Sequence, residues 1–398
     1  MAEKKNVPQV RFNNFTEEWV QTKIENTFVD YIEKTIVQNQ YPVLTSSQQK
    51  GIVLQQEYFA DRQVTTNDNI GYFVLPRGYF TFRSRSDNDV FVFNRNDIVD
   101  KGIISYFYPV FNVTGADSNF FLRRVNHGIK HQLAIAAEGT GQHVLSLKKF
   151  KEIITLFPKE KEQQKIGELF EHMDMLIGDT QSKLEKLQNL RLSMLEKMFP
   201  RAEENVPKVR FKGFDGAWER MPASELFDAY VDKGHPELPV LSATQDAGMV
   251  IRDKLGKSVF HEVANEVGYK RVLPGQFVIH LRSFQGGFAH SAIEGITSPA
   301  YTVFGFKEPK KHDDFFWKYV FMSKQFIKRL ETVTYGIRDG RSISYDEFLT
   351  LDFLFPTKEE QSLICKYLLN LDSLISMRRQ EIDKLQALKK GLLEKMFV

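Results

Sequence analysis

Two short clusters in this 398-residue chain carry side chains that could hydrogen-bond to the edges of nucleic-acid bases. Each cluster follows a strand-like run, and setting Phe80 against Phe277 places Arg85 on Arg282. Guanidinium groups pair with guanine and amide groups with adenine, so DNA contact is our preferred interpretation, with an ordinary solvated loop as the alternative. The predicted contact residues are Arg83, Arg85, Ser86 and Asn88 in the first cluster, and Arg282, Ser283 and Gln285 in the second.

A second set of candidates lies in glycine-containing stretches farther along each half. Gly141, Gly336 and Gly340 predict tight loops in which backbone amides could approach a phosphate. Other basic residues suit phosphate contact rather than base reading, and a solvated face is the alternative for them. The loop candidates are Gln142, His143, Arg338, Arg341 and Ser342, and the phosphate candidates are Arg123, Arg124, Lys130, Lys310 and Lys311.

The motifs of common catalytic centres are absent from the sequence. It contains no Gly-x4-Gly-Lys-Ser/Thr phosphate loop and no Asn/Asp-Pro-Pro-Tyr/Phe methyltransferase motif. His127 and His131 have the i, i+4 spacing of a helical metal pair, but no third ligand is evident. Cys365 stands among aliphatic residues and is expected to be a small core residue. We therefore predict no catalytic residue, metal or cofactor in this chain.

These candidates belong to a tandem duplication. Residues 6–12 read Asn-Val-Pro-Gln-Val-Arg-Phe, and residues 205–211 read Asn-Val-Pro-Lys-Val-Arg-Phe, an offset of 199. The Leu-Glu-Lys-Met-Phe sequence at 195–199 returns at 393–397, an offset of 198. A nearly constant offset across unrelated motifs indicates one ancestral unit copied in line. The interiors differ more than this frame, so both halves could do the same work on different targets.

Each repeat is predicted to end in a long helix that begins near Pro158 or Pro356, with acidic residues in its first turn. From Glu162 to Met198 it would extend about 55 Å at ~1.5 Å per residue, allowing for a break near Gly178. Apolar residues recur at mostly heptad spacing, which favours antiparallel pairing of the two helices over packing of each on its own domain. The predicted seam residues are Ile177, Leu184, Leu187, Leu190, Met194, Met198, Ile375, Ile382, Leu385, Leu388, Leu392 and Met396.

The interiors contain short runs rich in β-branched and aromatic residues and few helical stretches, of which 315–330 is the clearest. The sequence thus predicts a mixed α/β fold, with two globular domains joined by two long antiparallel coiled-coil helices in pseudo-two-fold symmetry. The predicted strands include 91–93, 275–279 and 300–304. The predicted division is 1–146 and 205–344 for the domains, and 147–204 and 345–398 for the spacer helix regions.

Composition is consistent with a cytoplasmic protein. One cysteine excludes a disulfide framework and a cysteine-rich zinc module, and no apolar run reaches the ~18–20 residues that span a bilayer. The formal net charge of +3 permits a nucleic-acid partner without requiring one.

Taken together, the sequence resembles the specificity subunits of type I restriction–modification systems over nearly its whole length. The resemblance rests on the Val-Pro-x-Val-Arg-Phe segments, the Pro-x3-Glu-Gln helix starts with Asp174 or Asp372 downstream, and the Leu-Glu-Lys-Met-Phe ends. It also rests on a Gly-x2-Ser-x2-Tyr region in each variable interior. The first copy departs there, with Tyr-Phe-Tyr-Pro at 106–109 against Pro-Ala-Tyr-Thr at 299–302, and Ser362 stands where the first copy has Gln164.

The resemblance implies two target-recognition domains, each reading one half of a split, asymmetric site in double-stranded DNA. It implies two methyltransferase subunits docked on the helices, restriction subunits joining them, and S-adenosylmethionine, ATP and magnesium bound by those partners. On physical grounds, equivalent surfaces would meet half-sites about one helical turn (~34 Å) apart. A self-contained methyltransferase or nuclease with an unrecognised site remains an alternative, as does a pure protein–protein scaffold.

Overall fold

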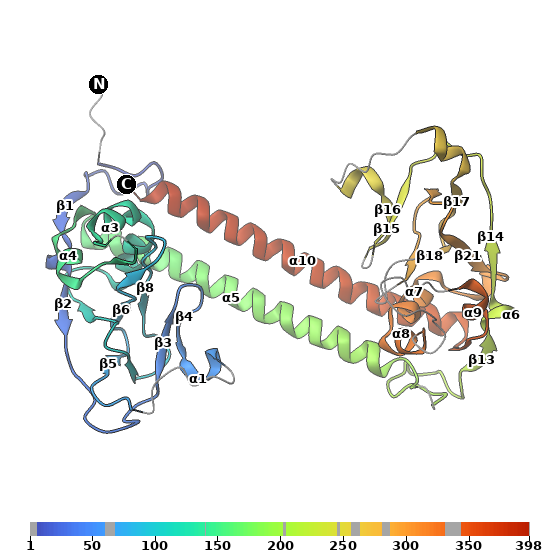
Figure 1. Cartoon of the computed structure of the whole chain (residues 1–398), viewed down its shortest axis with the longest axis horizontal. Helices are drawn as coiled ribbons and strands as arrows, with labels where there is room; N and C mark the ends of the chain where they lie inside the picture. Colours follow the sequence, from blue (N-terminus) through green and yellow to red (C-terminus); the bar gives the residue numbers. More distant parts are fainter. Residues whose placement is uncertain are drawn as a thin grey trace. The chain divides into compact units, whose positions relative to one another are not determined.

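The computed structural model of the chain divides into two compact units. Unit 1 comprises residues 1–182 and 380–398, and unit 2 comprises residues 183–379. Each unit therefore takes most of one repeat together with the last residues of the other repeat. Both units mix helix and strand, as the sequence predicts (Figure 1). The residues described are 6–59, 68–139, 141–201, 204–244, 247–255, 263–280, 287–330 and 344–397.

A four-stranded antiparallel sheet in the order β2-β10-β6-β8 forms the centre of unit 1, with helices packed against it. Its strands are β2 (Phe28–Tyr31), β10 (Val110–Val113), β6 (Phe80–Phe82) and β8 (Phe93–Arg95). The two-stranded pairs are β1 (Val20–Lys23) with β12 (Ile154–Phe157), β3 (Leu44–Ser47) with β4 (Gly51–Leu54), β5 (Phe73–Pro76) with β9 (Lys101–Ile104), and β7 (Arg85–Ser86) with β11 (His143–Val144). The helical segments are η1 (Ile24–Thr27), α1 (Gln55–Tyr58), α2 (Ser118–Arg123), the π-helical turn η2 (Arg124–Gly128), α3 (Lys130–Ala136) and α4 (Leu147–Glu152).

Unit 2 repeats this plan with a sheet in the order β14-β21-β18-β19. Its strands are β14 (Phe227–Tyr230), β21 (Thr302–Phe306), β18 (Phe277–Ile279) and β19 (Phe288–His290). The pairs are β13 (Glu219–Pro222) with β22 (Asp352–Phe355), β15 (Leu241–Thr244) with β16 (Gly248–Ile251), and β17 (Lys270–Val272) with β20 (Gly295–Thr297). The helical segments are α6 (Ala223–Leu226), η3 (Arg252–Leu255), η4 (Val263–Gly268), η5 (Pro309–Lys311), α7 (Asp314–Met322), α8 (Lys324–Leu330) and α9 (Tyr345–Leu349).

The strand registers support the alignment of the two interiors. Phe111 pairs with Phe80 in unit 1, and Phe304 pairs with Phe277 in unit 2. These four phenylalanines are fully buried. Phe80 and Phe277 are therefore structural equivalents, and β6 and β18 end at equivalent residues, Phe82 and Ile279.

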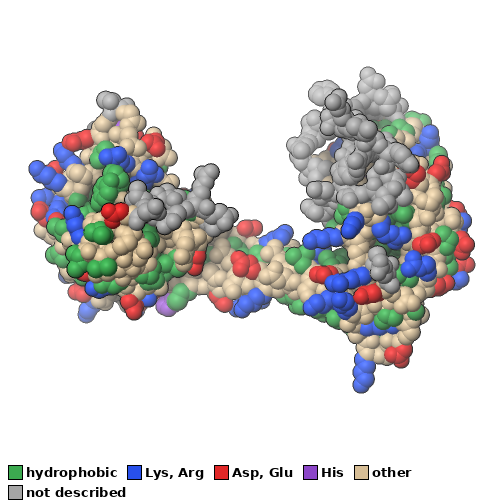
Figure 2. Space-filling model, turned by 60° about the horizontal axis from the view of Figure 1, so that its bottom comes forward, with side chains coloured by type: hydrophobic (Ala, Val, Ile, Leu, Met, Phe, Trp, Pro, Cys, Tyr) green, Lys and Arg blue, Asp and Glu red, His purple; other side chains and the backbone are tan. Residues whose placement is uncertain are grey.

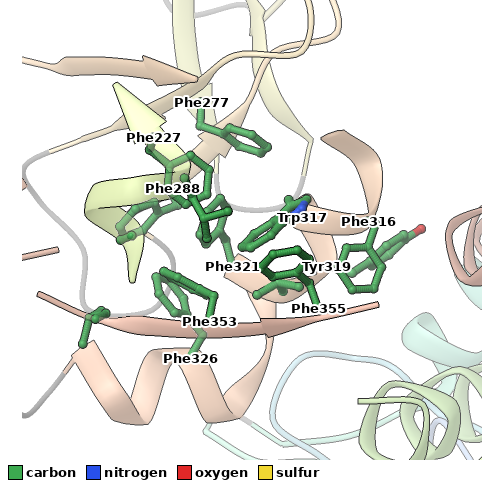
Figure 3. Close-up of a cluster of buried hydrophobic side chains, with 14 of the residues drawn as sticks. Phe227, Phe277, Phe288, Phe316, Trp317, Tyr319, Phe321, Phe326, Phe353 and Phe355 are labelled. Carbon is green, nitrogen blue, oxygen red and sulfur yellow. The ribbon is translucent and has the colours of Figure 1, made fainter. Parts of the chain in front are cut away.

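The helix predicted at 315–330 is two helices, because the backbone is extended at Ser323 (ψ 143°). The Ser323 hydroxyl accepts a hydrogen bond from the amide of Phe326 (3.2 Å), so this residue caps α8 instead of continuing α7. Both helices pack their aromatic side chains against the sheet, and Figure 3 shows Trp317, Phe321 and Phe326 in that cluster.

The two long helices are α5 (Glu160–Lys197) and α10 (Lys358–Met396), of 38 and 39 residues. The break expected near Gly178 does not occur. A Cβ at this position would meet nothing within 4 Å, so the glycine lies on an open face, where its cost of about 1 kcal/mol relative to alanine does not interrupt the helix.

Both units contain a contact between the two long helices. In unit 1, Asp174 on α5 is paired with Lys389 near the end of α10. In unit 2, Arg191 near the end of α5 is paired with Asp372 in the first half of α10. In each unit the early part of one helix meets the late part of the other, so the pairing is antiparallel and the predicted shared seam is confirmed.

Two predicted seam residues are wrong. Leu190 is 38% exposed and Leu388 is 56% exposed. The stripe advances by three and four residues in turn, so the position after Leu187 is Arg191, and Leu190 lies one residue away from the stripe. In α10 the stripe position is Lys389, and Leu388 lies one residue away from it. The seam is thus interrupted by a charged position in each helix. The remaining predicted seam residues are buried (Ile177, Met198, Ile375, Ile382 and Met396) or partly buried (Leu184, Leu187, Met194, Leu385 and Leu392).

The end of each long helix, with the residues that directly follow it, completes the hydrophobic core of the unit built mainly from the other repeat. Phe397 lies edge-on to Trp19, with ring centroids 6.3 Å apart, and Met396 is buried in the same core. Phe199 lies edge-on to Trp218 at 6.2 Å in unit 2. The repeated Leu-Glu-Lys-Met-Phe sequence therefore places its apolar residues in a core.

The unit limits differ from the predicted division of the chain. Residues 147–204 were predicted as a spacer region, but β12 within that range pairs with β1, from Val20↔Phe157 to Lys23↔Ile154. The strand pair β13 and β22 does the same in unit 2. No helix in the described ranges carries an apolar stretch long enough to cross a bilayer.

Candidate nucleic-acid interface

The structure brings together the two predicted sets of contact residues in unit 1. Strand β7 pairs antiparallel with β11, in the register His143↔Ser86 and Val144↔Arg85. The 83–88 cluster and the 142–143 pair, which are more than 50 residues apart in sequence, therefore lie on one edge of the unit. We name this edge the unit 1 reading edge, comprising residues 83–90 and 142–144.

Ser86 and Asn88 shape the turn in this edge. The Ser86 side chain is only 4% exposed, and its hydroxyl accepts from the amides of Asn88 (3.3 Å) and Val90 (3.0 Å). The same hydroxyl donates to the Asn88 side-chain oxygen (3.0 Å). Asp89 within the turn has φ +59°, a conformation that Asp and Asn tolerate better than most residues. Ser86 therefore positions its neighbours and is not directed to solvent.

Two aspartates hold the side chains at the other end of the edge. The Gln142 amide donates to the Asp87 carboxylate (3.0 Å), and the His143 Nδ1 contacts the Asp89 carboxylate. Carboxylates can accept from cytosine N4, so acidic residues are compatible with base reading, although they lower the positive potential of the surface. Figure 2 likewise shows acidic side chains among the Lys and Arg side chains of each unit.

The two arginines of the edge are open to a ligand. Arg83 and Arg85 are both exposed, and neither has an ion-pair partner within the described residues. A guanidinium presents its donors in a planar fork that suits bidentate bonding to guanine. The reading edge therefore offers two cations whose donors remain available.

Arg124 is not a surface residue, and its prediction as a phosphate contact is wrong. It is 2% exposed, lies over the Trp19 ring at 5.7 Å and donates to the Thr155 hydroxyl (2.5 Å). Burial lowers the pKa of the guanidinium to about 10, so it stays charged at neutral pH. It is the first residue of the π-helical turn η2, between α2 and α3.

The other two phosphate candidates of unit 1 differ from each other. Arg123 is largely buried and binds Asp174, so it attaches α2 to the long helix α5. Lys130 is exposed on α3 and remains a predicted phosphate contact. In unit 2, Lys310 and Lys311 are exposed in η5, where Lys311 pairs with Glu308.

The predicted base-reading and loop contacts of unit 2 lie outside the described residues. The described neighbours show where their segments begin and end: the His280 amide donates to the Gly287 carbonyl (2.9 Å), so residues 281–286 connect β18 to β19. Residues 331–343 connect α8 to α9. The predictions concerned are Arg282, Ser283, Gln285, Arg338, Arg341 and Ser342.

We call the long helices α5 and α10, together with the two Val-Pro-x-Val-Arg-Phe segments bonded to them, the frame. Sequence reasoning missed the residues that hold this frame together. The buried Glu162 carboxylate accepts two hydrogen bonds from Arg11 (2.6 and 2.7 Å), and Glu360 accepts two from Arg210 (2.7 and 2.8 Å). These bonds raise the pKa of both arginines. The arginine of the Val-Pro-x-Val-Arg-Phe motif thus binds the glutamate of the Glu-Gln motif, and the co-occurrence of the two motifs in both repeats was the available signal.

The glutamine of the same motif joins the long helix to one helix of the interior, α2 in unit 1 and α7 in unit 2. The Gln163 side-chain oxygen accepts from the Asp117 amide (3.0 Å), and its amide donates to the Pro158 carbonyl (2.8 Å). Gln361 makes the same two bonds to Asp313 (2.9 Å) and Pro356 (2.8 Å). Both aspartates cap the helix that follows, α2 or α7. In the part of the chain that the structure describes, no three His, Cys, Asp or Glu side chains form a group that could hold a metal ion.

Comparisons with known proteins point in one direction. No family model matches the chain. It is 24% identical over 273 residues to the type I restriction enzyme MjaVIII specificity subunit of Methanocaldococcus jannaschii, and the match covers 64% of this chain and 64% of that protein. The chain thus spans less than two thirds of the curated relative. The crystal structure of the type I restriction–modification S subunit from M. genitalium matches with a TM-score of 0.58 and 13% identity, over 98% of this chain and 99% of that one, which shows a shared fold.

Proposed function

We propose that this chain, a relative of the type I restriction–modification specificity subunits, recognises DNA and has no catalytic centre of its own. One observation carries the proposal: the two units share strand order and frame contacts, yet their edges after β6 and β18 differ in sequence. Because the two units have the same strand order, the segments after β6 and β18 are expected to face DNA in the same way. Their different residues would read different bases. The target is therefore a split site whose two halves differ.

The partners follow from this role. Methylation and cleavage are done by methyltransferase and restriction subunits, which bind S-adenosylmethionine, ATP and magnesium, and the assembly works on DNA in the cytoplasm. The methyltransferase subunits dock on the α5–α10 frame, because its residues are equivalent in the two units whereas the edges are not. Contact with DNA is made by the unit 1 reading edge, by Lys130 and by the segments that contain Arg282 and Arg338.

Methylation mapping tests the proposal. Host DNA is sequenced with methylation detection in cells that carry the partner subunits, with and without this chain. A split, asymmetric motif that appears only in the presence of the chain is the expected result. The matched test is the purified chain alone with S-adenosylmethionine and DNA; methyl transfer or cleavage by the lone chain would show a self-contained enzyme instead.

Substitution of Arg282 separates base reading from phosphate contact. Arg282→Ala in the complex should weaken recognition of one half-site by ~1–3 kcal/mol if the guanidinium is bidentate to guanine. The other half-site preference should not change, and Arg85→Ala is the matched variant for the first half. An equal loss for all sequences would mean that Arg282 contacts a phosphate.

The spacing of the two halves tests the role of the long helices. One extra helical turn inserted between Leu184 and Met194 lengthens α5 by about 5.4 Å. Because α5 contributes to both units, the preferred number of base pairs between the half-sites should change, or binding should be lost. An unchanged spacer would contradict the proposal that these helices set the spacing.

A further inference from the structure

A chain of aromatic rings leads from the core of unit 1 to the reading edge. Tyr72, which is buried, lies edge-on to Tyr106 with ring centroids 6.5 Å apart, and Tyr106 contacts Phe107 at 4.3 Å. The Arg85 guanidinium lies over the Phe107 ring, 4.9 Å from its centroid. Tyr106 is 59% exposed and Phe107 is 41% exposed, so these two rings at the outer end of the row of rings are in contact with solvent.

Hydrogen bonds hold the two ends of the Arg85–Phe107 contact in place. Phe107 is in the turn between β9 and β10, and its carbonyl accepts from the Ser84 hydroxyl (3.0 Å). The Ser84 carbonyl accepts from the Leu145 amide (2.8 Å). Arg85 in β7 is paired with Val144 in β11. The residue next to Arg85 is thus bonded to the residue on which the guanidinium lies.

We propose that Phe107 is a positioning residue that holds the Arg85 guanidinium for bidentate reading of a guanine in the half-site of unit 1. An exposed arginine loses side-chain entropy when it binds, and a guanidinium already lying on an aromatic ring has lost part of it beforehand. The ring covers one face of the guanidinium and leaves the N–H groups at its edge available to a base. This inference rests on the proposed function and assigns a residue to it.

Unit 2 lacks the aromatic pair. The registers align Phe111 with Phe304, so Phe107 corresponds to Ala300, and Tyr106 to Pro299. Neither side chain offers a π-face to an arginine. The positioning device therefore belongs to one half-site, and unit 2 is the internal control.

The test is a double-mutant cycle on the assembled complex with its methyltransferase partners, scored by methylation of a site library randomised in both halves. Phe107→Leu keeps an apolar side chain but removes the ring, and should lower discrimination at one position of the first half-site about two- to fivefold. Phe107→Trp keeps a π-face and should retain discrimination. In the Arg85→Ala background, Phe107→Leu should have no further effect, and the second half-site should be unchanged throughout.

Other outcomes would overturn the inference. A loss from Phe107→Leu that is as large without Arg85 would show that the ring contacts DNA or supports the fold directly. Reduced assembly with the methyltransferase subunits would show that the exposed rings are a protein-docking surface. A split motif that neither Arg85→Ala nor Phe107→Leu alters would overturn this inference alone, whereas the absence of a chain-dependent split motif would overturn the proposed function.

Discussion

Asp174 in unit 1 and Asp372 in unit 2 occupy the same place in the repeat but have different partners. Asp174 binds two cations, Arg123 from α2 and Lys389 from α10. Asp372 binds one cation, Arg191 from α5, and accepts from the phenol of Tyr319 on α7 (2.7 Å). Both carboxylates thus join three helices. The difference shows that each carboxylate needs two hydrogen-bond donors from other helices, and that one donor can be either charged, as Arg123 is, or neutral, as Tyr319 is.

The unit 1 reading edge, with the Phe107 ring beside it, contrasts with the frame. Frame residues such as Glu162 and Glu360 are buried and accept the same pair of hydrogen bonds in the two units. Arg85 and Phe107 are exposed, and Ala300 takes the place of Phe107 in unit 2. A buried charge without its partner is costly, so both copies retain the pair. An exposed loop residue contributes little to stability and is free to change with the target.

The largest expected effect comes from the exchanged helix ends. Phe199→Ala should destabilise unit 2 by about 3–5 kcal/mol, because its buried ring packs on Trp218 and Phe316. Phe397→Ala should destabilise unit 1 by less, since Phe397 is only partly buried. Urea unfolding with hydrogen exchange measures both. Loss of protection in the unit that lacks the substituted residue, rather than in the one that contains it, would contradict the packing described.

Smaller and equal effects are expected from the two buried glutamates. Glu162→Gln and Glu360→Gln should each cost about 2–3 kcal/mol, because a guanidinium loses the charge that it faces. Glu168→Gln, on the exposed surface of α5, is the control and should change the free energy of unfolding by less than about 0.5 kcal/mol. Markedly unequal costs for the two buried sites would show that the frame is not equivalent in the two units.

Acid should weaken unit 2 through His312, which corresponds to Ala116 in unit 1. Burial lowers the pKa of His312 to about 4, below the usual value of about 6.5 for an unfolded chain. As the pH falls below about 6.5, the unfolded state binds a proton that the folded state excludes, so stability is lost until about pH 4. The loss by pH 5 is about 2 kcal/mol. His312→Phe, beside Phe306 and Phe355, should flatten the pH dependence of unit 2 unfolding; an unchanged slope would reject this origin.

The smallest expected effects come from the charge pairs of Asp174 and Asp372. Double-mutant cycles with Asp372→Asn and Arg191→Met, and with Asp174→Asn and Lys389→Met, should each give a coupling of about 0.5–1 kcal/mol, because these pairs are partly exposed. Added salt should reduce the total contribution of Asp174 more than that of Asp372, since two cations are screened in the first case and one in the second. Equal salt dependence at the two sites would remove the distinction.

Much of the architecture could be predicted because it depends on sequence patterns that are local or repeated. The duplication, the two long helices and the equivalence of Phe80 and Phe277 all follow from spacing along the chain. The heptad stripe also predicted most of the seam. It failed at Leu190 and Leu388, which are exposed, because a leucine three residues after a seam leucine also fits a heptad spacing.

Patterns along the chain were enough to establish that one unit was copied, that its ends are long amphipathic helices and that basic residues follow equivalent strands. Only the tertiary structure decided that Arg124 is buried while Arg85 is exposed, and that each Met-Phe end completes a core in the unit made mainly from the other repeat. The reason is physical: repetition and periodicity depend on neighbours along the chain. The exposure of one arginine, and the partner of one carboxylate, depend on segments that fold back from more than 50 residues away.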